Sequence, residues 1–411
     1  MYLFIKLKDL KSGDKMNVPK LRFKEFNDKY NITKVSEIID VIDGDRGNNY
    51  PKANDFYDSE FCLFLNAGNV TKNGFNFKNN QFITKEKDKK LRKGKLLIND
   101  IVLTTRGTVG NVAWFNEKTP YKNIRINSGM VINRIKENGH LLPEYLYSYM
   151  KSPVFEIQVN KMNYGSAQPQ LTVSGINKFN IQYPTINEQK KVSTIMLLLD
   201  KKIELQSKKI EDLKLFKKGL HNQLFNEIDG EDYLLSDIAK FENGKGHENI
   251  VDENGNYILI NSKFISTEGS VIKNCSEQLT PLYKDDITMV MSDLPNGKAL
   301  AKCYYIEFDN KYSLNQRICR ISIKDKEEFN PKYLFYTLNR NPYYLKFDDG
   351  VNQTNLKKDD ILNINLNIPD KTIQDKNANI LTLIDKIINK ELSKLDSLNS
   401  LKKGLIQNMF V

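Results

Sequence analysis

The sequence has few of the residues on which common enzyme sites depend. Of its 411 residues, 3 are histidine and 4 are cysteine, and no two cysteines form the C-x-x-C pair typical of zinc and redox sites. Glycine-rich phosphate and dinucleotide loops are absent, as are the H-E-x-x-H and G-x-S-x-G motifs. We therefore expect no catalytic residue, no metal site and no cofactor in this chain.

Long apolar runs are also missing. No run approaches the roughly 18 residues that a membrane-spanning helix needs. The first residues carry lysine inside their apolar stretch and no small-residue cleavage site, so no signal peptide is predicted. Residues 1–16 are interpreted as an N-terminal extension, with Met16 as an alternative native start. The unpaired cysteines favour a reducing compartment, so we expect a cytoplasmic protein.

What the sequence has in excess is positive charge. Lysine and arginine total 62 against 51 aspartate and glutamate, which gives a net charge of +11 and a pI of about 9.1. A basic surplus attracts polyanions because neutralised phosphates release condensed counterions. Nucleic acid is therefore a candidate partner, although lysine-rich composition can also arise without any binding role.

The chain contains one unit twice. Residues 165–225 align with residues 350–410 without a gap, and about a third of the positions are identical. Three shorter segments upstream also match: 100–105 with 286–291, 126–136 with 314–324, and 143–153 with 331–342. Copies of about 190 residues are too long for a solenoid repeat. They indicate a duplicated module, which favours a pseudo-two-fold arrangement.

Each copy predicts the same order of elements. Short β-branched and aromatic runs broken by Gly, Asn and Asp, such as 61–66 and 256–265, predict strands. A short helix follows, with Pro143 or Pro331 in its first turn. A loop rich in Gly and Gln and one alternating strand come next. The first part of each copy is therefore predicted to be a β-rich domain.

A long helix closes each copy. Residues 187–225 contain no proline, and apolar residues recur there every three or four positions, as they do in 380–405. Such a narrow apolar seam is typical of helices that pair with each other. A single surface helix packed on its own domain would have a wider stripe and about a dozen residues. Gly219 and Gly404 lie inside the helical pattern at matched positions, so we expect close backbone contact there.

Several segments are similar to the specificity subunit of Type I restriction–modification systems. The most specific is P-T-I-N-E-Q-K-K at 184–191, where the first long helix begins, and F-K-K-G-L at 216–220 lies near its end. Further similar segments are N-V-P-K-L-R-F at 17–23, T-T-R-G-T-V-G-N-V at 104–112 and G-S-A-Q-P-Q-L at 165–171. The resemblance covers nearly the whole chain.

The resemblance implies an α+β fold. Two β-rich target recognition domains with small helices would be joined by two long antiparallel coiled-coil spacer helices, with pseudo-two-fold symmetry. The implied boundaries are 17–186 for recognition domain 1, 187–228 for spacer helix 1, 229–371 for recognition domain 2 and 372–411 for spacer helix 2. The second copy has Ile373 where the first has Glu188, which weakens a capping role for that glutamate.

The resemblance also implies partners. Such a subunit has no catalysis of its own, and its two recognition domains each read half of a bipartite, asymmetric site on double-stranded DNA. It docks two methyltransferase subunits, which bind S-adenosylmethionine and methylate adenine. It can also recruit two restriction subunits, which use ATP and Mg²⁺. The alternative is a stand-alone DNA-binding or scaffold protein without a methyltransferase partner.

Candidate DNA contacts lie in polar loops and at the ends of two strands. The hairpin loops differ between the two copies, whereas the Gly/Gln loops partly match and suit backbone contact more than base readout. Arg and Lys suit guanine, Asn suits adenine and Asp accepts from cytosine. Arg106 can instead hold a phosphate, which fixes register without reading sequence, and exposed polar loops can be plain surface turns. The candidates in the first copy are Arg46, Asn48, Asn49, Asn66, Asn69, Thr105, Arg106, Thr108, Tyr164 and Gln168. Those in the second copy are Lys245, His247, Asn261, Lys263, Ser292, Asp293, Asn296, Lys298 and Gln353.

Overall fold

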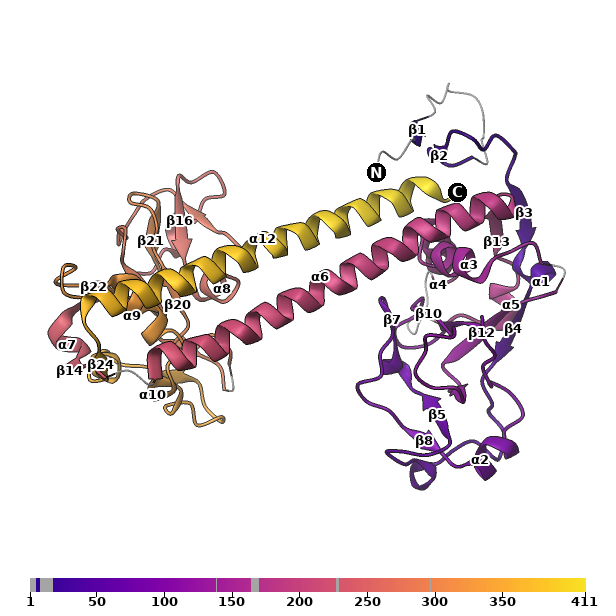
Figure 1. Ribbon diagram of the computed structural model, residues 1–411, viewed down its shortest axis with the longest axis horizontal. Helices are drawn as coiled ribbons and strands as arrows, with labels where there is room; N and C mark the ends of the chain where they lie inside the picture. The colour runs from indigo at the N-terminus through magenta and orange to yellow at the C-terminus, as the bar shows by residue number, and fades with distance from the viewer. Residues whose placement is uncertain (1–4, 8–17, 138, 164–169, 227–228, 296) are drawn as a thin grey trace. The chain divides into compact units, whose positions relative to one another are not determined.

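The computed structural model describes residues 5–7, 18–137, 139–163, 170–226, 229–295 and 297–411 (Figure 1). Contacts divide the chain into two units. Unit 1 comprises residues 1–207 and 393–411, and unit 2 comprises residues 208–392. Each unit therefore contains a β-rich part together with one half of each long helix.

Unit 1 is built on a four-stranded antiparallel sheet. Its order is β10 (Val112–Trp114), β9 (Ile101–Thr104), β12 (Met130–Ile135) and β4 (Ile39–Asp43). One face packs on a three-stranded sheet of β11 (Ile124–Ile126), β5 (Cys62–Leu65) and β8 (Phe82–Ile83). The other face packs on α3 (Pro143–Met150), α4 (Pro153–Asn163) and the start of α6 (Ile186–Asn226). Alternate side chains enter the two cores because successive residues of a strand point to opposite faces.

Unit 2 repeats this plan strand for strand. Its four-stranded sheet has the order β15 (Ala239–Asn243), β22 (Ile318–Ile323), β18 (Ile287–Val290) and β20 (Cys303–Tyr305). Its three-stranded sheet consists of β17 (Asn274–Cys275), β16 (Tyr257–Ile260) and β21 (Tyr312–Leu314), and β16 pairs parallel with β21 as β5 does with β11. On the other face lie α9 (Pro331–Leu338) and α12 (Lys371–Met409). The duplication predicted from the sequence is therefore a duplication of the fold.

Shorter elements complete the two units. Small antiparallel pairs are β1 (Ile5–Leu7) with β2 (Leu21–Phe23), β3 (Asn31–Lys34) with β13 (Asn180–Tyr183), β6 (Val70–Thr71) with β7 (Gly74–Phe75), β14 (Glu231–Leu234) with β24 (Asn365–Ile368), and β19 (Ser292–Asp293) with β23 (Thr354–Asn355). Short helices are α1 (Val35–Ile38), α2 (Lys85–Lys90), α5 (Val173–Ile176), α7 (Leu235–Ile238), α8 (Ser262–Ser266), α10 (Pro342–Leu345) and α11 (Lys358–Leu362).

The strand expected over 256–265 is wrong in its second half, because Asn261 caps α8 by accepting from the backbone N–H of Phe264 at 2.9 Å.

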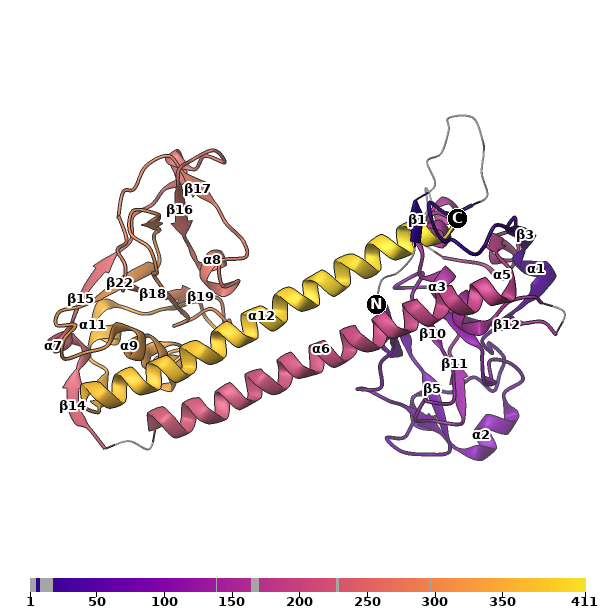
Figure 2. The ribbon, with the colours of Figure 1, turned by 45° about the horizontal axis from the view of Figure 1, so that its top comes forward.

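The two long helices run antiparallel within each unit (Figures 1 and 2). In unit 1, Asp200 of α6 forms an ion pair with Lys402 of α12. In unit 2, Lys217 of α6 pairs with Asp385 of α12 at 2.5 Å. Asp200 and Asp385 are matched positions of the repeat, as are Lys217 and Lys402. The two ion pairs are therefore the same contact with the two copies exchanged.

The matched glycines of the long helices do not make the close contact expected of them. Apart from the chain neighbours and the nearby backbone of the same helix, no described heavy atom lies within 4 Å of the position that a Cβ would occupy at Gly219 or Gly404. Both positions face open space, so steric approach of another backbone within this chain does not explain them.

A matched glutamine anchors each long helix to its own unit. Gln189 donates through Nε2 to the carbonyl oxygens of His140 and Pro184, at 2.8 and 2.9 Å, and accepts from Leu142 N at 2.9 Å. Gln374 makes the same three bonds in unit 2, to Glu328, Pro369 and Asn330. Both side chains are buried. These bonds satisfy backbone groups at the helix entry, and the bond to the carbonyl oxygen of Pro184 or Pro369 is buried.

Glu188 forms a buried ion pair with Arg22 instead of a helix cap. It is 1 % exposed and accepts from Arg22 Nε and Nη2 at 2.8 and 2.7 Å, and Tyr30 Oη donates to it at 3.1 Å. The second copy has no segment equivalent to β2 against its helix entry within the described chain, and there Asp370 caps α12 by accepting from Ile373 N at 3.0 Å. Ile373 takes the place of Glu188 in the second copy, where no arginine among the described residues is buried and in need of a carboxylate.

Candidate nucleic-acid interface

The candidate loops of unit 1 adjoin the four-stranded sheet where its strands end, on one side of the sheet. β4 ends at Asp43, its neighbour β12 begins at Met130, and β9 on the other side of β12 ends at Thr104. Because neighbouring antiparallel strands place these three ends side by side, the loops after β4 and β9 and the loop before β12 become neighbours. Residues far apart in the sequence therefore share one surface.

Hydrogen bonds hold these loops to one another. Arg46 Nη2 donates to Ser128 O at 3.2 Å, and Thr105 N donates to Gly129 O at 2.8 Å. Leu171, which follows the Gly/Gln loop, donates through its backbone N to Thr105 O at 3.1 Å. Residues 44–49, 105–111, 127–129 and 170–171 thus form one continuous surface, called here the unit 1 edge.

Unit 2 has the equivalent surface. Lys245 N donates to Leu314 O at 3.3 Å, and Met291 N donates to Arg317 O at 3.0 Å. Leu356 N donates to Met291 O at 2.8 Å, which ties in the second Gly/Gln loop. The described residues of 244–249, 291–298, 315–317 and 350–356 form this surface, called the unit 2 edge.

About half of the candidate side chains are open to solvent. The exposed ones are Arg46, Asn48, Asn49, Arg106 and Thr108 in unit 1, and Lys245, Lys263, Lys298 and Gln353 in unit 2. Gln170 lies beside Arg106, and with its amide oxygen turned to the guanidinium it accepts from Nε and Nη2 at 3.3 and 2.8 Å. A guanidinium steered in this way is positioned to contact a base edge or a phosphate. Tyr164, Gln168 and Asn296 lie outside the described residues.

The strand-end asparagines shape turns. Asn66 Oδ1 accepts from Gly68 N at 2.9 Å, and Asn69 Oδ1 accepts from Asn66 N at 2.9 Å. Asn69 is 1 % exposed and donates to the carbonyl oxygens of Asn76 and Asn79. Asn66 and Asn261 are half-buried, and both cap the turn that follows their strand. The side-chain oxygens of Asn66 and Asn261 are therefore engaged within the chain, whereas Asn69 is engaged through both its oxygen and its nitrogen.

Other candidates brace the edge loops from inside. His247 is buried, with Nδ1 2.7 Å from Lys245 O and Nε2 2.7 Å from Ser313 Oγ. Ser292 is buried and accepts from Gln353 Nε2 at 2.7 Å. Asp293 accepts from three backbone N–H groups, those of Leu294, Ala299 and Leu300. Thr105 is also buried. The bonded side chains of His247, Ser292 and Asp293 therefore fix the shape of the loops that carry the exposed ones.

One loop of each edge was not predicted from the sequence. Residues 127–129 lie between the loops 44–49 and 105–111, and hydrogen bonds join them to both. Residues 315–317 lie between 244–249 and 291–298 in the same way, and this loop carries exposed Gln316 and Arg317. Arg317 has a φ of 66° and so turns the chain sharply. The signal was present in the alignment of 126–136 with 314–324, where the first copy has Gly129 and the second has Arg317.

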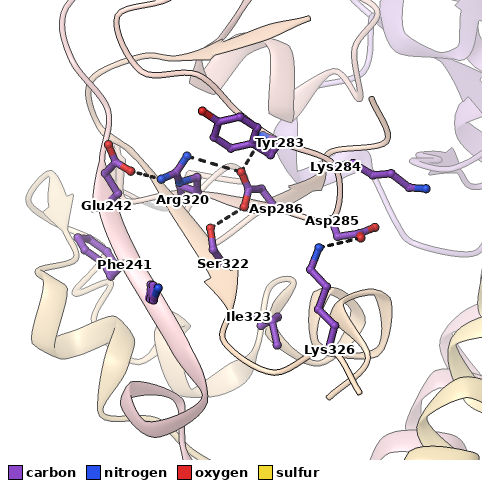
Figure 3. A pocket seen from close by; sticks show the side chains of 11 residues that line it. Phe241, Glu242, Tyr283, Lys284, Asp285, Asp286, Arg320, Ser322, Ile323 and Lys326 are labelled. Carbon is purple, nitrogen blue, oxygen red and sulfur yellow. Dashed lines mark hydrogen bonds and ion pairs between the residues drawn. The ribbon is translucent and has the colours of Figure 1, made fainter. Parts of the chain in front are cut away.

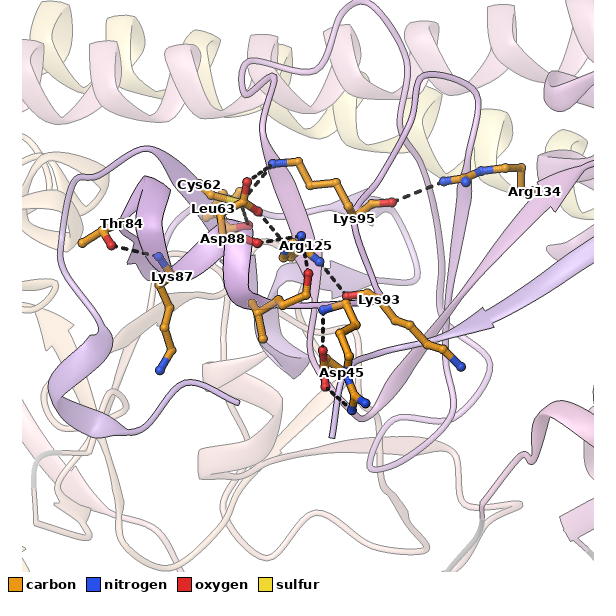
Figure 4. A network of polar contacts seen from close by, with 12 residues as sticks. Asp45, Cys62, Leu63, Thr84, Lys87, Asp88, Lys93, Lys95, Arg125 and Arg134 are labelled. Carbon is orange, nitrogen blue, oxygen red and sulfur yellow. Dashed lines mark hydrogen bonds and ion pairs between the residues drawn. The ribbon is translucent and has the colours of Figure 1, made fainter. Parts of the chain in front are cut away.

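A lysine-rich segment extends the unit 1 edge and was also missed. Two buried carboxylates hold it in place (Figure 4). Asp45 accepts from the backbone N of Arg92 at 2.6 Å, and Asp88 accepts from Lys95 Nζ at 2.7 Å and Arg125 Nε at 2.5 Å. The exposed cations of the segment are Lys89, Lys90, Arg92 and Lys93. Such a row beside polar loops suits a phosphate backbone.

The two carboxylates stay ionised despite burial. Burial alone would raise the pKa of Asp88, but the bonds from Lys95 and Arg125 outweigh it and hold that pKa below its ordinary value. Burial likewise opposes ionisation of Asp45, and the N–H groups of Gly47 and Arg92 lower its pKa. A lowered carboxyl pKa adds stability that is present above the unfolded-state pKa and is lost as pH falls through the folded one. The basic segment is therefore firmly held at neutral pH.

Unit 2 has an open pocket of about 540 Å³ beside β15 and β22, lined also by residues 283–286 and Lys326 (Figure 3). Its charged groups largely pair with each other: Lys326 with Asp285 at 3.0 Å, and Arg320 with Glu242. Asp286 accepts from Ser322 Oγ at 2.5 Å, and burial raises its pKa. Because most of its charges are already neutralised, we assign this pocket no ligand.

The described residues contain neither a candidate metal-binding group of side chains nor a helix that could span a membrane. No group of three or more His, Cys, Asp or Glu side chains in them is arranged to hold a metal ion. None of their helices is long and apolar enough to cross a membrane.

Comparison with known proteins points to one family. The family model described as the Type I restriction modification DNA specificity domain matches residues 2–215 and 227–401. The Type I restriction enzyme MjaIX specificity subunit of Methanocaldococcus jannaschii is 30% identical over 151 residues, which are 36% of this chain and 33% of that protein. The chain thus spans about a third of the length of this curated relative.

Two solved structures share the fold over nearly their full length. The S subunit of a Type-I restriction-modification system from M. genitalium has a TM-score of 0.63 and 16% identity, and the match covers 96% of this chain and 99% of that one. A chain from a structure concerned with complex assembly and conformational transition of the type I R-M system has a TM-score of 0.55 and 13% identity, with 93% and 97% covered. At these identities the likeness shows the fold, and it agrees with the α+β architecture expected from the sequence.

Proposed function

Because this chain belongs to the Type I restriction–modification DNA specificity family, we propose that it reads a bipartite, asymmetric site on double-stranded DNA and seats two methyltransferase subunits. The unit 1 edge and the unit 2 edge each read one half-site. The boundaries 17–186, 187–228, 229–371 and 372–411 delimit the two recognition domains and their spacer helices. The chain acts in the cytoplasm and has no catalysis of its own.

One observation carries the proposal: the two units agree in their scaffold and differ in their exposed edge residues. The same glutamine anchor and the same aspartate–lysine pair recur in both units. At the edges, Arg106 and Thr108 stand in one unit, whereas Lys298 and Arg317 stand in the other. A reader of two different half-sites needs this combination, because base edges specify sequence and a common scaffold fixes register.

Two matched apolar patches on the long helices support two equivalent seats. Patch 1 lies in unit 1 and consists of Ile195 and Leu198 of α6 with Leu398 and Leu401 of α12. Patch 2 lies in unit 2 and consists of Ile380 and Leu383 of α12 with Leu213 and Phe216 of α6. Each member of patch 1 has its repeat counterpart in patch 2. Two copies of one partner would therefore meet the same surface twice.

Both helices carry exposed members of each patch beside a shared ion pair. Leu198 and Leu401 lie within two residues of the pair between Asp200 and Lys402. Leu383 and Phe216 lie within two residues of the matched pair between Asp385 and Lys217. Leu198, Leu401, Leu383 and Phe216 are 50 to 60% exposed. Apolar side chains that are exposed in register on paired helices suit an apolar partner surface.

The methyltransferase partners would bind S-adenosylmethionine and methylate adenine, and restriction subunits would bring ATP and Mg²⁺. A stand-alone DNA-binding or scaffold protein is the alternative function. Co-expression with the methyltransferase, followed by native mass spectrometry of the purified complex, separates the two. We expect two methyltransferases per chain. A chain that purifies alone under these conditions would contradict the proposal.

A further inference from the structure

Two of the most exposed apolar side chains of the described residues lie on the unit 2 edge. Val351 is 77% exposed and Leu294 is 69% exposed; apart from Leu215 on α6, no other large apolar side chain among the described residues is as open. Leu294 follows β19, and Val351 precedes β23. Large apolar side chains are normally withdrawn from water, so a pair of them on a polar recognition surface calls for an explanation.

The two loops that carry these side chains are joined and well fixed. β19 and β23 pair antiparallel, with Asp293 opposite Thr354. Asp293 accepts from Leu294 N at 2.9 Å, and Asp349 accepts from Val351 N at 2.9 Å. Both apolar residues therefore start from turns that a carboxylate holds in place. Their exposure reflects a defined loop shape.

The surroundings of the pair indicate what it contacts. Exposed Lys298 and Arg317 lie on the same edge, and within the described chain neither forms an ion pair. Exposed Gln316 and Gln353 lie there as well. Unpaired cations fit a polyanion and do not fit the apolar core of a protein interface, which is depleted in charge. The one strongly apolar group in the major groove of DNA is the C5 methyl of thymine.

We propose that Leu294 and Val351 contact the 5-methyl group of thymine in the half-site read by unit 2. The inference rests on the proposed function, since it assumes that the unit 2 edge enters a groove of DNA. The matched hairpin of unit 1 carries Arg106 and Thr108 instead. The apolar contact is therefore a property of one half-site only, and it gives the two recognition domains different preferences.

Uracil substitution tests this without altering the protein. Each thymine of the mapped site is replaced singly by uracil, which removes the methyl group and keeps base pairing, and the affinity of the methyltransferase complex is measured by fluorescence anisotropy. Loss of one buried methyl corresponds to about a fourfold weaker affinity. We expect this loss at a thymine of one half-site, and we expect it to disappear in the variant L294A/V351A. The matched control L215A, whose residue lies on α6, should keep it.

The outcomes separate this inference from the function on which it rests. Specific binding that no uracil weakens would overturn the inference alone. The inference also fails if the uracil effect persists unchanged in L294A/V351A, or if neither half-site contains thymine. Absence of any specific DNA binding would overturn the proposed function, and the inference with it.

Discussion

The double substitution Leu198→Glu and Leu401→Glu is expected to reduce the number of bound methyltransferases from two to one. These residues form the exposed part of patch 1. Burying an unpaired carboxylate in an apolar interface costs several kcal/mol, so binding at that seat should weaken by about 100-fold or more. Native mass spectrometry of the co-purified complex measures the change directly.

Mirror and control variants make this test specific. Phe216→Glu with Leu383→Glu should also leave one methyltransferase, and all four substitutions together should leave none. Leu215→Glu is the matched control, because Leu215 is 71% exposed on α6 but its repeat counterpart is Ser400. That variant should keep two methyltransferases. Patch variants that still bind two copies would show that the seats lie elsewhere.

Glu188→Ala is expected to be the most damaging single substitution in the scaffold of unit 1. It removes the only carboxylate paired with Arg22 among the described residues, and Arg22 is 5% exposed. Breaking a buried ion pair by removing one partner costs about 3 to 5 kcal/mol, because the other charge remains buried. Hydrogen exchange at 18–26 and at the start of α6 should rise accordingly.

Two further variants separate the buried charge from loss of the glutamate as such. Glu204→Ala, on the same helix, breaks the exposed pair with Lys201 and should cost at most about 1 kcal/mol. Arg22→Met combined with Glu188→Leu removes both charges and should recover most of the loss. Equal effects of Glu188→Ala and Glu204→Ala would contradict this account of the helix entry.

The sequence predicted those parts of the fold that depend on local pattern. The long helices α6 and α12 follow from a period of three to four that no proline interrupts. The repeat predicted two like units because matched segments such as DIVLTT and DITMVM occupy the same strand in each. The pairing of the long helices was also predicted from the sequence, since a narrow apolar seam is typical of helices that pack against each other.

What the sequence did not predict depends on contacts between distant residues. Nothing local distinguishes His247 from an exposed loop residue, yet Ser313 lies 2.7 Å away and the ring is buried. Glu188 looked like a capping residue until Arg22 was placed beside it. Arg317 stands at a position where the two copies differ, so likeness between the copies does not indicate it. The choice among exposed edge residues likewise needed the sheet order that brings three loops together.

The most direct test of the central claim is a map of methyladenine by single-molecule sequencing. A host without endogenous adenine methylation would express the methyltransferase with this chain, or the methyltransferase alone. We expect a split, asymmetric adenine motif with an unread gap, present only when this chain is expressed. A contiguous palindromic motif, or the same map with and without this chain, would contradict the assignment of two half-sites to the two units.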